Sequence, residues 1–69
     1  MKTVKIMIEI KVSKWATHVA VDENGSIYEY SCEPDANDLD SCWDAENECE
    51  RLDEIEEVVN WRETLTEVK

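Results

Sequence analysis

The sequence lacks three features that would place it in common functional classes. No apolar run approaches the roughly 18 residues of a membrane-spanning helix. No Cys-x-x-Cys pair occurs, although structural zinc sites usually bring their ligands in such close pairs. Basic residues are few, because 7 Lys and Arg stand against 18 Asp and Glu, for a formal net charge of −11. This charge argues against binding to nucleic acid or to an anionic membrane, since both would repel the chain.

The chain is also short, with 69 residues, and we expect one small acidic domain over residues 1–69. A core of this size cannot enclose a buried active-site cavity of ordinary enzyme dimensions, roughly 300 Å³ or more. We therefore expect no enzyme, no catalytic residue and no cofactor. The first residues alternate apolar and polar and do not form a secretory signal. The three cysteines, an odd number, then favour free thiols in a reducing cytoplasm.

Alternation of apolar and polar residues is the main structural signal. Over residues 3–12 every even position is Val or Ile, and a period of two over β-branched residues predicts a strand. A second strand is predicted over about residues 15–22 and a third over about 26–33. Pro34 ends the third strand, because proline cannot donate a ladder hydrogen bond.

Asn24-Gly25 is the strongest turn signal, because a type I′ hairpin needs two central residues that tolerate positive φ. If these two residues form the whole loop, Val21 lies opposite Tyr28. That register gathers the tyrosines and the valines of both strands on one apolar face, and a consistent apolar face is what fixes register.

The C-terminal half allows two interpretations. Residues 34–42 predict an acidic loop, and apolar residues at helical spacing between 45 and 59 predict an acidic C-terminal helical segment. Like charges four residues apart, at Glu46, Glu50 and Glu54, weaken such a helix. The alternative is a fourth strand at about 49–56 and only a short terminal helix after Asn60. Either way the fold class is α+β, built on a three-stranded antiparallel β-meander.

Two groups of residues carry side chains that could bind a metal ion, but neither has the ligand spacing of a known type of metal site. Cys32, Cys42 and Cys49 with His18 would make a Cys₃His set, but intervals of nine and six residues between the cysteines do not match a zinc knuckle. Residues 35–40 carry oxygen ligands at calcium-loop spacing, but Asp40 stands where that loop needs glycine. We therefore expect no metal site, and cysteines that act as small buried apolar residues.

Two stretches resemble a known group of proteins. The run Trp15-Ala16-Thr17-His18-Val19-Ala20-Val21-Asp22, followed by Asn24-Gly25, is similar to the W-A-x-x-V-A-x-D-x-x-G front of small uncharacterised proteins from tailed bacteriophages. The ending Asn60-Trp61-Arg62-Glu63-Thr64-Leu65 resembles their D-W-R-E-S-L tail. The resemblance implies a phage-encoded protein of the host bacterial cytoplasm with a β-rich fold. It also implies a strand before the terminal tryptophan, and it implies no catalytic residue.

Acidic residues are concentrated in residues 33–57, the acidic segment, where twelve Asp and Glu stand against Arg51 alone. Duplex DNA presents one charge per roughly 1.7 Å of axis, and this segment folded on one side of a domain would present a comparable density. We therefore predict an inhibitor that imitates DNA and occupies the basic groove of a host DNA- or RNA-binding protein, such as a restriction, CRISPR, nuclease or DNA-repair enzyme. The residues predicted to bind this partner are Asp35, Asp38, Asp40, Trp43, Asp44, Glu46, Glu50, Asp53, Glu54 and Glu57.

Other interpretations of the same features stay open. A charged face keeps a small domain soluble without any partner, although solubility needs a net charge of only about 2 to 8. A non-catalytic accessory module that self-associates through a sheet edge, as a homodimer, is the alternative function. Trp43 either anchors a partner among its acidic neighbours or covers the core. Salt separates the two functions, because it weakens mimicry and leaves edge pairing intact.

Overall fold

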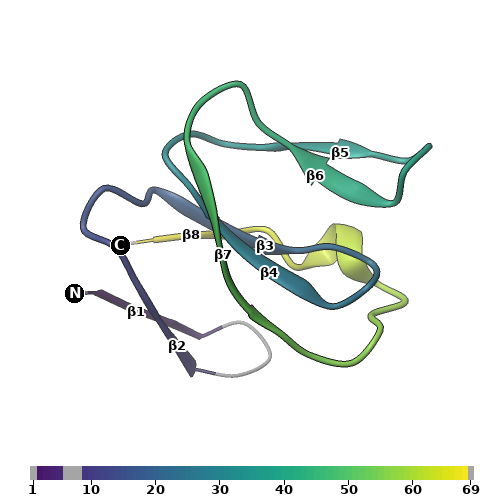
Figure 1. Ribbon diagram of the computed structural model, residues 1–69, viewed down its shortest axis with the longest axis horizontal. Coiled ribbons are helices and arrows are strands. Elements are labelled where there is room, and N and C mark those ends of the chain that lie inside the picture. The colour runs from purple at the N-terminus through teal and green to yellow at the C-terminus, as the bar shows by residue number, and fades with distance from the viewer. Residues whose placement is uncertain (1, 6–8, 69) are drawn as a thin grey trace.

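The computed structural model describes residues 2–5 and 9–68 and places them in three antiparallel sheets (Figure 1). The four-stranded sheet has the order β7 (Cys49–Glu54), β4 (Ser26–Tyr30), β3 (His18–Val21), β8 (Thr66–Glu67). The two-stranded sheets are β1 (Lys2–Lys5) with β2 (Glu9–Val12), and β5 (Asp35–Asn37) with β6 (Cys42–Asp44). In the described part of the chain the one helical element is the short 3₁₀ turn η1 (Trp61–Glu63).

The single strand predicted over residues 3–12 is wrong, because the structure has a hairpin there. Val4 of β1 lies opposite Ile10 of β2, and Lys2 lies opposite Val12. The middle of the prediction, residues 6–8, lies outside the described residues. In this register even positions of β1 lie opposite even positions of β2, so the apolar positions of both strands fall on the same face. A period of two therefore fits a long strand and a hairpin with an odd loop equally well.

The β3–β4 hairpin was predicted correctly in its strands but not in its register. Val21 lies opposite Ile27 and not opposite Tyr28. The loop has three residues, because the Asp22 N–H donates to the Ser26 carbonyl at 2.9 Å and so closes the hairpin around residues 23–25. Within the loop the Gly25 N–H donates to the Asp22 carbonyl at 2.9 Å, and Gly25 has φ of 93°. This is a type I turn followed by a left-handed glycine, the usual three-residue hairpin. The shift by one residue places Glu29 on the same sheet face as the valines.

The C-terminal half is strand and turn, so the predicted helical segment over residues 45–59 is wrong. The alternative with a fourth strand at about 49–56 is confirmed, because β7 spans Cys49–Glu54 and pairs with β4. The terminal helix is reduced to the three residues of η1, after which β8 pairs with β3. The predicted loop over residues 34–42 contains β5 and the start of β6.

The core residues are distributed along the chain from Val12 to Val68. Trp43 of β6 and Trp61 of η1 pack edge to face, with ring centroids 5.7 Å apart at an angle of 83°. Trp15, in contrast, is partly exposed at the surface. The buried apolar residues are Val12, Ala16, Val19, Ala20, Val21, Ile27, Tyr30, Trp43, Val58, Trp61 and Val68. Such a small core leaves the β5–β6 hairpin and β7 with most of their side chains in solvent.

Candidate partner-binding surface

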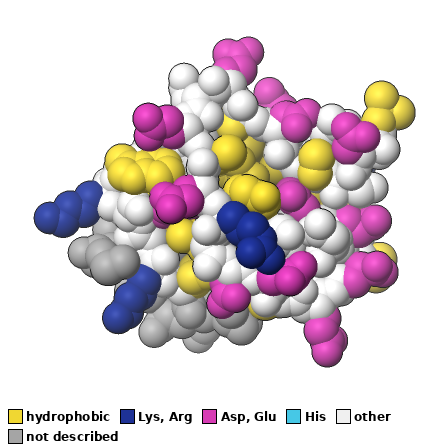
Figure 2. All heavy atoms as spheres, in the orientation of Figure 1, with side chains coloured by type: hydrophobic (Ala, Val, Ile, Leu, Met, Phe, Trp, Pro, Cys, Tyr) yellow, Lys and Arg dark blue, Asp and Glu magenta, His cyan; other side chains and the backbone are white. Residues whose placement is uncertain are grey.

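All twelve acidic side chains of the acidic segment are exposed. In Figure 2 the carboxylates are spread over most of the visible face, including the upper right where the β5–β6 hairpin lies, whereas most of the basic side chains that are visible lie toward the left. The predicted binding acids occupy β5 (Asp35), the β5–β6 turn (Asp38, Asp40), the end of β6 (Asp44), β7 (Glu50, Asp53, Glu54) and the flanking loops (Glu46, Glu57). The segment therefore wraps one hairpin and one sheet edge in negative charge.

Few of these acids are neutralised within the chain. Arg51 pairs with Glu54 at 3.2 Å, and Arg62 pairs with Asp38 at 3.1 Å. His18 lies 3.9 Å from Glu33. The other acids of the segment form no ion pair with the side chains of residues 10–68. Both arginines of the chain are thus already engaged, and most of the negative charge faces solvent without a partner.

Four of the acids border a shallow groove of about 520 Å³ between the start of β5 and the end of β6. We call it the acidic groove, and its lining residues are Cys32, Glu33, Asp35, Asp44, Ala45, Glu46 and Asn47. A concave surface lined by carboxylates and one amide suits the ammonium of a lysine or the guanidinium of an arginine. The sequence showed the acids but gave no sign that residues on two sides of the β5–β6 hairpin meet.

Trp43 lies in the core, as the second interpretation of its role expected. Its side chain keeps only 8% of its surface exposed, and its indole N–H donates to the Val21 carbonyl at 3.0 Å. Its backbone N–H donates to the Asp22 carboxylate at 2.9 Å. An interface anchor needs an exposed face, so Trp43 serves to hold the acidic hairpin on the sheet. Its neighbours in sequence present the charge.

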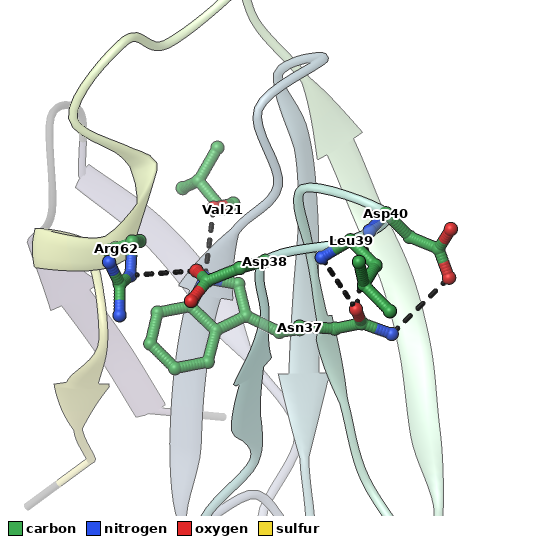
Figure 3. A network of polar contacts seen from close by, with 7 residues as sticks. Val21, Asn37, Asp38, Leu39, Asp40 and Arg62 are labelled. Atoms are coloured by element: carbon green, nitrogen blue, oxygen red, sulfur yellow. Dashed lines mark hydrogen bonds and ion pairs between the residues drawn. The ribbon is translucent and has the colours of Figure 1, made fainter.

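The turn of the β5–β6 hairpin is organised by one amide side chain (Figure 3). The Asn37 Oδ1 accepts hydrogen bonds from the backbone N–H groups of Leu39 and Asp40, at 3.1 and 3.2 Å. Its Nδ2 donates to the carboxylates of Asp40 and Asp44, at 3.2 and 2.8 Å. Ser41 closes the turn with φ of 53°, a left-handed backbone that is uncommon outside glycine. The turn thus fixes two acids and lifts Leu39 into solvent.

Asp22 contacts this hairpin through the Trp43 N–H, and Asp22 and Cys42 both have a raised pKa. Burial raises the pKa of the Asp22 carboxyl above 3.8; the hydrogen bond from the Trp43 N–H opposes that rise, and the nearby Asp44 charge adds to it. Burial also raises the pKa of the Cys42 thiol, and the charges of Asp22 and Asp44 act in the same direction. A thiol held protonated is a weak nucleophile, so Cys42 is poorly suited to covalent catalysis.

The cysteines are free; Cys32 and Cys42 are half-buried and Cys49 is exposed. The expectation that they act as small buried apolar residues is therefore wrong. No group of three or more His, Cys, Asp or Glu side chains that could hold a metal ion occurs among residues 2–5 and 9–68. The same part of the chain has no helix with the length and apolar content to cross a membrane.

Glu29 is a buried acid that sequence reasoning left unassigned. Its side chain is 0% exposed. Its two carboxylate oxygens accept hydrogen bonds from the Ser13 N–H and the Ser13 hydroxyl, both at 2.7 Å. Because Ser13 directly follows β2, the carboxylate holds the N-terminal hairpin to the central sheet. The one-residue shift in the β3–β4 register explains why this acid points inward.

Comparison of the chain with protein-family models, with curated proteins and with solved structures finds no match.

Proposed function

We propose that this chain is a phage-encoded, non-catalytic inhibitor that imitates DNA and binds in the basic groove of a host nucleic-acid-acting protein. The observation that carries the proposal is the exposed acidic segment, whose charge is largely unpaired within the described residues. The phage origin, the host cytoplasm and the inhibitory role rest on the resemblance of residues 15–25 and 60–65 to phage proteins. The target class is a restriction, CRISPR, nuclease or DNA-repair enzyme.

The physical argument is electrostatic. Carboxylates on a folded scaffold attract the lysines and arginines that a DNA-binding protein directs at phosphates, and they do so before contact is made. Between exposed groups this attraction is screened over about 10 Å at 0.1 M salt. Complex formation should therefore be fast and tight at low salt and should weaken steeply as salt is added.

The test is a pull-down from bacterial lysate with the tagged chain, at low and at high salt, read by mass spectrometry. The test variant changes Glu46 and Glu50 to Gln, because both are exposed acids of the acidic segment. A matched control changes Glu23 and Glu67 to Gln. These two are also exposed and lie outside the segment, so both variants lose the same charge.

Recovery of one nucleic-acid enzyme by the wild type and by the control, but not by the test variant or at high salt, is the expected result. Addition of duplex DNA should then release the enzyme, because both ligands occupy one groove. An enzyme retained equally by the two variants, or one that is indifferent to salt, contradicts mimicry and leaves the acids as a solvated face.

Self-association through a sheet edge is the second candidate. In the described part of the chain β7 pairs on one side only, with β4, so its other edge is open. The acids on this edge oppose pairing between copies, because like charges would lie opposite each other. A homodimer of this kind would become tighter as salt is added, which is the reverse of mimicry. Sedimentation at two salt concentrations separates the two proposals.

A further inference from the structure

The end of the β5–β6 hairpin exposes apolar surface that the fold does not use. Leu39 is 96% exposed, and Val59 is 89% exposed. Single exposed apolar side chains are common and need no explanation. Here, however, the two most exposed large apolar residues of the described chain lie in segments that the fold ties together.

An ion pair makes this tie. Asp38, next to Leu39, accepts from Arg62 of η1 at 3.1 Å (Figure 3). Beside this pair lies a groove of about 460 Å³, lined by Ala36 of β5, by Val59 and Asn60, and by Arg62 and Glu63. We call the exposed apolar residues Ala36, Leu39 and Val59 the apolar tip.

Hydrogen bonds hold the backbone of the turn that carries Leu39. The Asn37 side chain bonds the backbone N–H of Leu39, so the leucine does not depend on its own contacts for its position. Ser41 fixes the far side of the turn, and its carbonyl accepts from the Glu23 N–H of the β3–β4 turn at 3.1 Å. A preorganised backbone reduces the conformational entropy that is lost on binding, which favours Leu39 as an interface anchor.

Charge selects the kind of surface that would cover this anchor. Leu39 lies directly between Asp38 and Asp40, and Asp44 shares the Asn37 amide with Asp40. An apolar pocket with an acidic rim would be repelled, whereas one rimmed by Lys or Arg would be attracted. A DNA backbone has no counterpart to Leu39, so this contact would be specific to the protein inhibitor.

We propose that Leu39 inserts into an apolar pocket, rimmed by lysine or arginine, beside the nucleic-acid groove of the target, with Asp38 and Asp40 contacting the rim. This inference rests on the proposed function and adds where the complex gains its specificity. It replaces Trp43 with Leu39 as the interface anchor.

The first experiment is photo-crosslinking in bacterial cells. The photoreactive residue p-benzoylphenylalanine replaces Leu39 in one variant and Glu56, an exposed acid away from the apolar tip, in a control. We expect the variant at position 39 to crosslink one nucleic-acid enzyme strongly. A crosslink at position 56 without one at position 39 overturns the inference and leaves mimicry standing. Absence of any crosslink at both positions overturns both.

The second experiment uses the captured enzyme in purified form. Leu39→Ser should weaken binding by about tenfold or more, whereas Leu39→Met, which stays apolar, should bind like the wild type. Because the Leu39 side chain is almost fully exposed, both variants should unfold at the wild-type temperature. Equal affinity of the Ser variant and the wild type overturns the inference alone. Binding that depends on Leu39 but not on salt overturns the basic rim and mimicry together.

Discussion

The two hairpins at the centre of this chain are built in opposite ways. In the β3–β4 hairpin nearly every residue is buried, including Val19, Val21 and Ile27, and a glycine turn sets the register. In the β5–β6 hairpin only Trp43 is buried. Its turn is held by the Asn37 side chain and its strands by a three-residue ladder.

The difference shows which residues are free to serve a partner. A buried hairpin is specified on both faces, because any change there disturbs packing. The exposed hairpin is attached by Trp43, by the Asp38–Arg62 ion pair and by the Ser41 carbonyl, which leaves most of its other side chains without a structural task. The proposed mimicry would explain their acidic character. Five changes test this contrast.

The largest effect should come from Gly25→Ala. Gly25 has φ of 93°, and an added Cβ would clash with the carbonyl oxygen of Ile55. The clash is with backbone, so residues 55–58, which dock on this turn, would have to move. We expect a loss of more than about 4 kcal/mol, enough to unfold a domain of this size. Circular dichroism during urea titration measures it, and a wild-type midpoint would show that the turn is not set by glycine.

Trp43→Ala should cost about 3–5 kcal/mol, the usual range for a buried tryptophan. The indole packs on Trp61 and donates to the Val21 carbonyl, and both contacts are lost. Trp43→Phe keeps part of the packing and should cost less. Hydrogen exchange should show early opening of β5 and β6. Equal protection of both hairpins in the alanine variant would contradict the main role of Trp43 in attaching the β5–β6 hairpin.

Glu29→Ala should cost about 2–3 kcal/mol, because two hydrogen bonds from Ser13 to a buried carboxylate are removed. Glu29→Gln should cost less, since the amide oxygen still accepts the Ser13 N–H. Chemical denaturation of both variants shows which of them loses more stability. Stability that rises in the alanine variant would mean that burial of the charge outweighs its hydrogen bonds.

Ser41→Gly should stabilise the protein by about 0.5–1 kcal/mol. Glycine removes the steric cost of the left-handed backbone, and this gain exceeds the conformational entropy that glycine loses on folding. Ser41 is the one residue besides glycine with positive φ in the described chain. The melting temperature should rise by a few degrees. Ser41→Ala is the control and should not raise it. The change in stability is opposite in sign to that of Gly25→Ala, so the two variants compare the turns of the two hairpins directly.

Asp22→Asn should give the smallest effect, and one that depends on pH. The pKa of Asp22 is raised above 3.8, mainly by burial, so the folded state holds the proton more tightly than the unfolded chain does. Its ionised form therefore reduces stability as the pH rises through the raised pKa. The Asn variant, which can still accept from the Trp43 N–H, should gain a few tenths of a kcal/mol at pH 7. The gain should vanish below about pH 3.8. A gain independent of pH would contradict this cause.

Sequence patterns predicted the strands of the central hairpin and, as an alternative, β7, because both follow from local alternation and turn residues. The register of β3–β4 could not be read from Asn24-Gly25, since a two-residue loop and a three-residue loop share that dipeptide. The choice depends on residues 55–58, which dock on the turn from far along the chain. The same shift placed Glu29 inside.

The candidate site was predictable only in part. The acids were visible as composition, and their exposure follows from their charge. The acidic groove was not visible, because it needs residues 33–35 and 44–47 to meet across a hairpin that the sequence presented as a loop. Leu39 was not singled out, because an apolar residue in a polar run gives no sign of whether it is buried.

The β5–β6 hairpin is inserted between β4 and β7, two strands that pair directly with each other. Lengthening its turn would cost mainly chain entropy, about 0.6 kcal/mol for each doubling of the loop. Residues 37–42 can thus be extended or exchanged while Trp43 keeps the hairpin docked. Under the proposed function, a lineage under pressure from a changing host could alter its target here without rebuilding the sheet, and an engineer could graft a foreign recognition loop at the same place.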